Sequence, residues 1–233
     1  MKKNCFLFSL LFLPAMLHAQ FSGIVVGYHA SYCNPGEINY IIRQYNNVNG
    51  SALEKEMPLL NWSSGLVLGF ALGDEERAVE IRTIRRSRTI YSEFDNQNAS
   101  GQTVLFRRQI KMQSNFLSIG YTKFLGKAHF GASLDLGNFK AAGKRAPESE
   151  IKDTDAAYLW GEDFGKLQMA TTIYGGISFI DGLICVRPYI QLQFFKKRLA
   201  TFEEWILAVN NSREQRLNNA GVELTFKLFS FSR

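Results

Sequence analysis

The alternation of side chains from Asn219 to Phe231 constrains the fold more than any other feature of the chain. Apolar residues occupy every second position from Ala220 to Leu228, and the positions between them are small or polar and include Glu223 and Lys227. Successive side chains of a β-strand point to opposite faces, so this pattern predicts a strand with one apolar and one polar face. The polar face needs partners for its charges, and the apolar face needs lipid or a protein core.

The first twenty residues have the layout of an export signal. Lys2 and Lys3 precede an apolar run from Cys5 to Leu13, and Leu17-His18-Ala19 follows as a cleavage site. The run is shorter than the roughly 18 residues that a spanning helix needs, which favours a cleaved signal over an anchor. We expect residues 1–19 to be a cleaved signal peptide and residues 20–233 to form one exported domain.

Composition narrows the class of this domain. The mean hydropathy is −0.12, and no second long apolar segment follows, which argues against a helical membrane protein. Without Lys2 and Lys3, 25 of the 27 basic residues remain against 21 acidic ones, a net charge of +4 that is too small to indicate nucleic-acid binding. Cys33 and Cys185 are too few for a disulfide scaffold. The mature chain is either a soluble exported protein or a membrane barrel.

Seven earlier segments repeat the alternation, which gives eight candidate strands. They span residues 21–28, 60–72, 78–94, 102–124, 128–137, 167–179, 184–194 and 219–231. The fourth loses its alternation near Ser114, which predicts a bulge or a change of environment there. A polar stretch from Lys140 to Lys166 predicts a long loop after the fifth strand.

Two connections carry helix signals. Asn34-Pro35-Gly36-Glu37 has the order of a helix start, and an apolar stripe at helical spacing follows it. That stripe consists of Ile38, Ile41, Ile42 and Tyr45. Thr201-Phe202-Glu203-Glu204 is a capping box, and Trp205 and Ile206 continue its helical spacing. We expect short helices after the first and seventh strands.

The lengths of the connections predict how the strands are arranged. Connections are long after the first, fifth and seventh strands and tight after the second, fourth and sixth, and the third and fourth strands form a long projecting hairpin. An outer-membrane barrel with both termini inside has short turns in the periplasm and long loops outside. The predicted fold is therefore all-β: an eight-stranded antiparallel up-and-down transmembrane β-barrel with short helices in the extracellular loops. Its even number of strands lets the sheet close without edges.

A soluble exported barrel of the lipocalin kind, which binds ligands inside, is the competing interpretation. It has the same alternation with the faces inverted, apolar inside and polar outside. The polar faces of this chain are rich in Gly, Ser, Thr and Ala beside a few charges, which suits a crowded lumen better than a wet surface. The sequence therefore favours the membrane barrel.

The closing strand also carries a family resemblance. Asn219-Ala220-Gly221-Val222-Glu223-Leu224-Thr225-Phe226 resembles the assembly signal of bacterial outer-membrane barrels, a polar residue, glycine two positions on, then two large apolar residues at alternate positions. With the export signal and eight strands, nearly the whole mature chain resembles the small outer-membrane β-barrel family. The chain departs from the commonest form by ending in Ser232-Arg233.

The resemblance implies a location and partners. The expected location is the bacterial outer membrane, with outer-membrane lipid and lipopolysaccharide around the barrel and the barrel-assembly machinery acting during biogenesis. Similar small barrels in this family serve as subunits of envelope secretion or assembly machines, so an envelope protein partner is an alternative. No nucleic acid and no cofactor are expected.

Six charged residues point inward by the alternation of their strands. An eight-stranded barrel is just wide enough for its own side chains, so conduction of solutes is not expected. Buried charges need partners and hydrogen bonds, which predicts a polar network in the lumen. The six are Glu80, Arg82, Asp135, Arg187, Glu223 and Lys227.

A basic cluster lies on the hairpin of the third and fourth strands. If this hairpin projects outward, its guanidinium groups would meet the phosphates of lipopolysaccharide or other anions. The alternative is a solvated hairpin whose charge is balanced by residues such as Glu93 and Asp95. The candidate anion contacts are Arg85, Arg86, Arg88, Arg107 and Arg108.

Neither catalysis nor metal binding is predicted. Only His29 and His129 remain after signal cleavage, and the strand alternation turns both inward at opposite ends of the barrel. A nucleophile needs its base beside it, and no metal-ligand spacing occurs. The predicted function is a structural or interaction role through the extracellular loops. The apolar stripe of the first helix either packs across the barrel mouth or docks a partner protein.

Overall fold

The computed structural model describes residues 21–33, 36–74, 76–97, 100–151, 159–160, 167–180, 183–196, 198, 200–208, 214 and 216–228. The predicted signal peptide, residues 1–19, lies outside the described residues. So do Asn34 and Pro35 of the predicted helix start and the terminal Ser232-Arg233.

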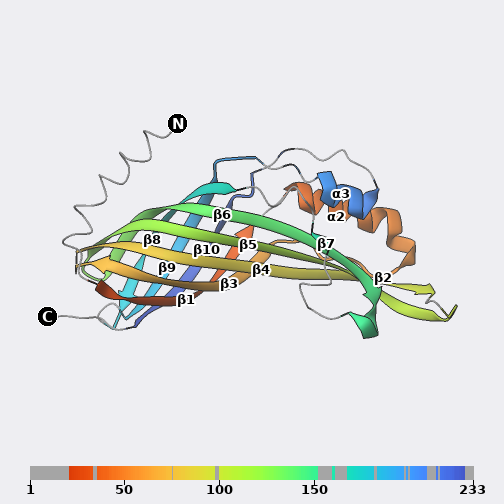
Figure 1. Cartoon of the computed structure of the whole chain (residues 1–233), viewed down its shortest axis with the longest axis horizontal. Coiled ribbons are helices and arrows are strands. Elements are labelled where there is room, and N and C mark those ends of the chain that lie inside the picture. Colours follow the sequence, from red (N-terminus) through yellow and green to blue (C-terminus); the bar gives the residue numbers. More distant parts are fainter. Residues whose placement is uncertain are drawn as a thin grey trace.

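Eight long strands close into an antiparallel ring (Figure 1). Each strand pairs with the strands on either side of it in the ring. β10 closes the ring by pairing with β1, from Asn219 opposite Cys33 to Leu228 opposite Ile24. The predicted eight-stranded up-and-down barrel is confirmed. The strands are β1 (Phe21–Cys33), β3 (Trp62–Gly73), β4 (Arg77–Gln97), β5 (Thr103–Leu125), β6 (Ala128–Pro147), β8 (Gln168–Phe179), β9 (Ile184–Gln193) and β10 (Asn219–Leu228).

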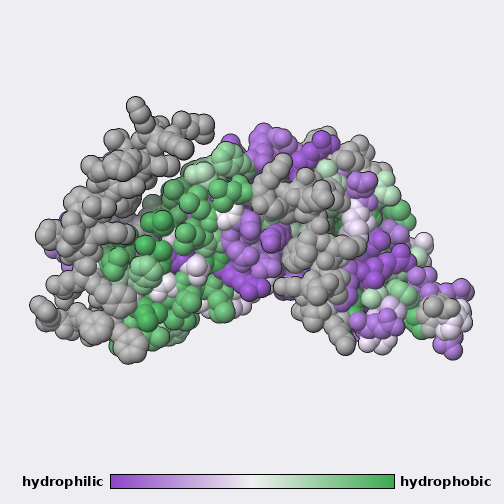
Figure 2. All heavy atoms as spheres, viewed as in Figure 1, coloured by the Kyte–Doolittle hydropathy of each residue, from purple (hydrophilic) through white to green (hydrophobic). Residues whose placement is uncertain are grey.

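The two faces of the ring differ as the alternation predicts. Outward-facing Leu66, Ile173 and Leu224 are exposed, whereas inward-facing Glu80 and Asp135 are at most 2% exposed. Figure 2 shows apolar residues gathered on the barrel half of the molecule and hydrophilic residues on the other half. This is the inverse of a soluble barrel, so the lipocalin alternative is wrong and the outer surface of the barrel suits lipid. Among the described residues, no helix is both long and apolar enough to cross a bilayer.

Tight turns join the strands at one end of the barrel. Gly126 takes φ 62° between β5 and β6, in the left-handed region that glycine adopts without a steric cost. Between β3 and β4, the Asp74 carboxylate accepts hydrogen bonds from the backbone N–H groups of Glu76 and Arg77 at 2.9 and 2.8 Å. These hydrogen bonds lower the pKa of Asp74, since they stabilise its charged form.

Strands β4, β5 and β6 continue far beyond the other strands of the barrel (Figure 1). They contain 21, 23 and 20 residues, about twice the 9–11 that a tilted strand needs to cross a bilayer. The predicted loop from Lys140 is therefore wrong at its start, because β6 runs on to Pro147, which pairs with Phe106 of β5. The polar residues from Lys140 to Pro147 belong to the part of β6 that lies beyond the lipid.

The register of β4, β5 and β6 is unbroken along this extension. Arg77 pairs with Lys123 and Gln97 with Thr103, with every position between them in register, so the predicted bulge at Ser114 is absent from the β4–β5 ladder. The other predicted explanation of the lost alternation, a change of environment near Ser114, agrees with the structure. From Phe116 toward Leu125, the inner face of β5 lines the lumen. Met112 and Ile110, on the other side of Phe116, are covered by helices.

Helices α2 (Gly36–Asn49) and α3 (Ala200–Leu207) cover the inner face of the extension. The α2 stripe is fully buried in an apolar core with α3 and the extended strands, so it packs at the barrel mouth instead of offering a docking face. The core residues include Ile38, Ile41, Ile42, Tyr45, Met57, Ile90, Ile110, Met112, Ala141, Phe202 and Ile206. At Gly143 a Cβ would come within 2.1 Å of the Trp205 ring, so glycine makes room for α3.

Short elements complete this part of the molecule. The 3-10 turn η1 (Gly50–Ala52) follows α2, and η2 (Glu148–Glu150) follows β6. Strand β2 (Leu53–Lys55) pairs with β4, and β7 (Leu159–Trp160) pairs with β6.

Two asparagines of α2, seven positions apart, bind the segment between β2 and β3. The Asn46 amide accepts from the N–H of Met57 at 3.0 Å and donates to its carbonyl at 2.9 Å. Asn39 does the same with Leu60, at 2.8 and 3.3 Å. These side chains satisfy backbone groups that no strand pairs, and they fix α2 against the extension.

Candidate functional site

A network of paired charges fills the middle of the lumen. Glu80 accepts a bidentate pair of hydrogen bonds from Arg187, at 2.6 and 2.7 Å. Glu223 accepts one from Arg82 at 2.6 Å, and Arg82 Nε lies 3.5 Å from Glu80. All four side chains are almost fully buried. Charge-assisted, bidentate pairs are the geometry in which buried charges are tolerated, so the network joins β4, β9 and β10 across the barrel.

The ring of Tyr174 lies within the same network. The guanidinium groups of Arg82 and Arg187 lie 5.5 and 5.3 Å from its centroid, within the range of cation–π attraction. Its hydroxyl lies 2.8 Å from Thr122 Oγ1. A Cβ at Gly131 would come within 2.7 Å of this ring, so small inward residues give the large ones space.

A second part of the network lies nearer the barrel mouth. Asp135 accepts from Ser133 Oγ at 2.9 Å, Thr172 Oγ1 at 2.5 Å and Gln191 Nε2 at 2.6 Å. The other end of the Gln191 amide accepts from Arg86 Nη1 at 2.8 Å. Gln191 therefore connects the Asp135 carboxylate with the Arg86 guanidinium through two hydrogen bonds.

The structure brings most of the predicted lumen charges together. Glu80, Arg82, Arg187 and Glu223 form ion pairs, and Asp135 joins through Gln191. Lys227 is half-buried near the turn end and makes no ion pair with any described residue. Sequence reasoning missed the uncharged members, since the alternation placed Tyr174 and Gln191 inward but gave no reason to single them out.

Both histidines are buried, and each makes hydrogen bonds to neighbouring side chains, although His29 Nε2 has no partner among the described residues. His129 Nε2 accepts from Arg187 Nε at 3.1 Å, so its proton is on Nδ1, which donates to Ser178 Oγ at 3.1 Å. A histidine that donates to a serine cannot take its proton, so this pair does not form a nucleophile. His29 Nδ1 lies at the other end of the lumen, 3.1 Å from the Tyr189 hydroxyl. Within the described ranges, no cluster of His, Cys, Asp or Glu could hold a metal ion.

Two small cavities lie among the described residues of the lumen and its mouth. A pocket at the mouth measures about 40 Å³ and a cavity beside Arg82 and Tyr189 about 10 Å³. A single water needs roughly 10–15 Å³ on this measure, so together they hold a few waters.

The predicted anion contacts do not share one surface. Arg86 lies inside the barrel, where it donates to Gln191, so it cannot meet lipid. The alternation that turns Arg82 inward also turns Arg86 inward, and this signal was available in the sequence. Arg85 and Arg88 are exposed.

Arg107 and Arg108 are engaged within the extension. Glu93 accepts from Arg107 at 2.7 Å, and this bond raises the pKa of the guanidinium. Glu148 pairs with Arg107 as well. Arg108 lies over the rings of Tyr45 and Trp205, where burial lowers its pKa. These two arginines hold the extension together. Arg88 is exposed but lies opposite Met112 of the core, on the other face of β4 from Arg85, so the predicted common anion surface is reduced to Arg85.

The Glu80–Arg187 pair gives a stability prediction. Substituting Glu80→Gln leaves a buried guanidinium without its carboxylate and should lower the free energy of unfolding by about 3–5 kcal/mol. The double substitution Glu80→Gln with Arg187→Gln should cost less than the sum of the two single ones. Urea unfolding of the refolded protein in lipid vesicles, followed by tryptophan fluorescence, measures both.

The exposed pair of Arg77 and Asp74, with side chains 62% and 61% exposed, supplies the control. Arg77→Gln should change the free energy of unfolding by less than about 1 kcal/mol. Additive costs for Glu80 and Arg187 would contradict a direct coupling in the lumen.

The chain was compared with protein families, curated proteins and solved structures, and only the solved structures gave matches. No protein-family model matches the chain, and no curated protein matches its sequence. The chain is similar to Ail, the attachment invasion locus protein of Yersinia pestis, in complex with the heparin analogue sucrose octasulfate, at 9% identity over 89% of this chain and 97% of that one, with a TM-score of 0.44. It is similar to Neisserial surface protein A (NspA) at 8% identity over 90% and 99%, with a TM-score of 0.44. These identities are too low to transfer a ligand or a partner.

Proposed function

We propose that the chain is a sealed outer-membrane barrel that holds a folded platform at the cell surface for interaction with other molecules. The platform consists of the extended parts of β4, β5 and β6 with α2 and α3. The observation that carries this proposal is its apolar core, which lies beyond the lipid-facing part of the barrel and contains residues such as Ile42 and Ile110 at 0% exposure. A segment that merely connected strands would not need a core of its own.

The lumen supports an anchoring role over a conducting one. Ion pairs between β4, β9 and β10 cross the barrel, and the described cavities hold a few waters. Opening a path would separate buried charges from their partners at a high cost in free energy. Arg187 and Ser178 hold both ring nitrogens of His129, which supports a role without catalysis.

The proposed orientation follows from the two ends of the barrel. The tight turns at Asp74 and Gly126 lie at the end opposite the platform, and short turns of outer-membrane barrels face the periplasm. The proposal includes cleavage of residues 1–19 during export and insertion by the barrel-assembly machinery. The platform then faces the outside of the cell.

Labelling on intact cells tests the orientation. In a background with Cys33→Ser and Cys185→Ser, a cysteine at exposed Ser51 of the platform should react with a membrane-impermeant maleimide. A cysteine at Lys127, in the turn between β5 and β6, should react only after the outer membrane is permeabilised. The reverse pattern would contradict the orientation, and stepwise conductance of the purified protein in planar bilayers would contradict the sealed lumen.

Arg85 is proposed to contact lipopolysaccharide phosphates. Arg85 is exposed and pairs across the ladder with Leu66, an exposed apolar residue of the lipid-facing surface. A guanidinium at this level lies where lipid headgroups begin, and each basic side chain near an anionic membrane surface contributes about 1 kcal/mol of attraction.

The substitution Arg85→Gln should weaken the association of detergent-purified protein with lipopolysaccharide by roughly fivefold, the ratio that about 1 kcal/mol per basic residue gives. The control is Arg43→Gln, an equal loss of charge on the exposed side of α2. Dephosphorylated lipopolysaccharide should bind the wild type and Arg85→Gln equally. An unchanged affinity of Arg85→Gln for the phosphorylated form would remove this contact.

A further inference from the structure

Both histidines of the barrel accept a hydrogen bond from an arginine, at opposite ends of the lumen. His29 of β1 accepts at Nδ1 from Arg86 Nε at 3.2 Å, and His129 of β6 accepts at Nε2 from Arg187 Nε at 3.1 Å. The two histidines are 1% and 2% exposed. A guanidinium nitrogen only donates, so each imidazole must keep the accepting nitrogen free of a proton. The closed lumen therefore requires both histidines to be neutral.

The other groups that face His29 do not relieve this requirement. Glu223 of β10 lies opposite His29 in the ladder, but its carboxylate already accepts from Arg82 of β4 at 2.6 Å. The Tyr189 hydroxyl of β9 lies 3.1 Å from the same Nδ1. A proton on Nδ1 would point an N–H group at the guanidinium of Arg86 and place two positive charges in contact.

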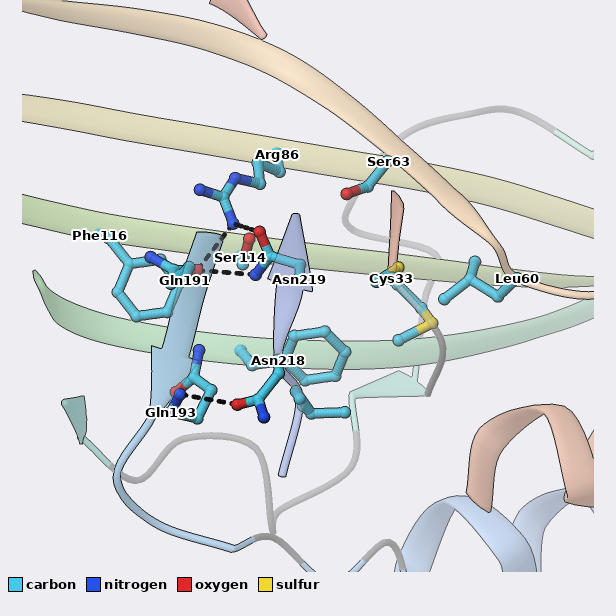
Figure 3. A pocket seen from close by; sticks show the side chains of 13 residues that line it. Cys33, Leu60, Ser63, Arg86, Ser114, Phe116, Gln191, Gln193, Asn218 and Asn219 are labelled. Carbon is cyan, nitrogen blue, oxygen red and sulfur yellow. Dashed lines mark hydrogen bonds between the residues drawn. The ribbon is translucent and has the colours of Figure 1, made fainter. Parts of the chain in front are cut away.

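Arg86 cannot turn away from His29 without further loss. Its Nη1 donates to Gln191 Oε1 at 2.8 Å and to Asn219 Oδ1 at 2.9 Å at the barrel mouth (Figure 3). Gln191 in turn donates to Asp135 at 2.6 Å. Displacing Arg86 would therefore disrupt the hydrogen bonds that join four strands at the mouth, beside the pocket that borders the platform core.

The neighbours of His129 impose the same requirement at the turn end. Glu80 of β4 holds Arg187 through Nη1 and Nη2 at 2.6 and 2.7 Å, so the guanidinium stays beside the ring. That bidentate pair already uses the Glu80 carboxylate. On the other side, His129 Nδ1 donates to Ser178 Oγ of β8 at 3.1 Å, and Ser178 Oγ lies 3.4 Å from Cys185 Sγ of β9. A second ring proton would again meet an arginine.

We propose that His29 and His129 form an acid-sensitive switch, in which their protonation displaces Arg86 and Arg187 and loosens the barrel at both ends of the lumen. The unfolded chain takes up these two protons freely, whereas the closed network does not. The folded state therefore binds fewer protons than the unfolded state, and stability falls as the pH falls below about 6.5, the ordinary pKa of histidine. This inference does not depend on the interaction role proposed for the platform.

The sequence assigns the response to these two residues. It contains three histidines, and the third, His18, belongs to the predicted signal peptide. The ordinary pKa values of carboxylates lie near 4 and those of thiols near 8.5. A change in stability between pH 7.5 and 5.5 therefore reports on His29 and His129.

Urea unfolding in phosphatidylcholine vesicles at pH 7.5 and 5.5 tests the switch. The unfolding equilibrium constant of the wild type should be about a hundredfold larger at pH 5.5, roughly tenfold for each histidine. His29→Gln and His129→Gln each keep an amide oxygen that accepts from arginine and does not titrate. Each should reduce the response to about tenfold, and the double variant should remove it.

An exposed histidine supplies the matched control. Lys127→His adds a titratable ring in the exposed turn between β5 and β6, where folding leaves it in water. Added to the double variant, this substitution should not restore the response to pH.

Nitrogen-15 chemical shifts of the histidine rings give a second measurement that needs no variant. In the folded wild type at pH 5.5, both rings should retain the shifts of neutral imidazole. Charged rings in the folded protein at pH 5.5 or equal unfolding constants at the two pH values would overturn the switch. So would a response that survives in the double variant or that Lys127→His restores.

Discussion

The pairing of buried charges across the lumen is the constraint on which the rest of the structure depends. The outward face of the barrel is apolar, so every charge within the lipid-facing strands must lie inside and find its partner there. Glu80, Arg82, Arg187 and Glu223 come from three strands and meet only when the ring is closed in the observed register. A one-residue slip would turn all of them toward lipid, so the network and the register specify each other.

The platform and the barrel are parts of one sheet. β4, β5 and β6 pass from lipid to the platform without a break in register, while the inner face changes its cover from polar side chains to the α2 and α3 helices. Long strands that ended in solvent would expose their edges and inner faces. The apolar core and the asparagines of α2 remove that exposure, and they give the platform a fixed position above the lumen.

Much of this fold could be predicted from the sequence, because the period of two fixes which residues share a face. The parity separated Leu224 from Glu223, and the small residues on the polar faces then favoured a membrane barrel over a soluble one. The lengths of β4 and β5 were predicted within a few residues, at 78–94 and 102–124. The length of β6 was not, because its part beyond the lipid loses the alternation and resembles a loop, as the residues after Lys140 did. Partners such as Glu80 and Arg187, 107 positions apart, are brought together by closure of the ring, which no local pattern encodes.

The central claim is that the apolar face of the barrel contacts lipid chains while the platform stands in water. Spin labels at cysteines replacing Leu66, Ile173 and Leu224, in a chain without Cys33 and Cys185, measure this directly in lipid vesicles. These positions should be relaxed strongly by oxygen and weakly by a water-soluble nickel chelate, and a label at Val48 of α2 should show the opposite. Chelate-accessible labels at Leu66, Ile173 and Leu224 would show that this face is wet and would contradict the account.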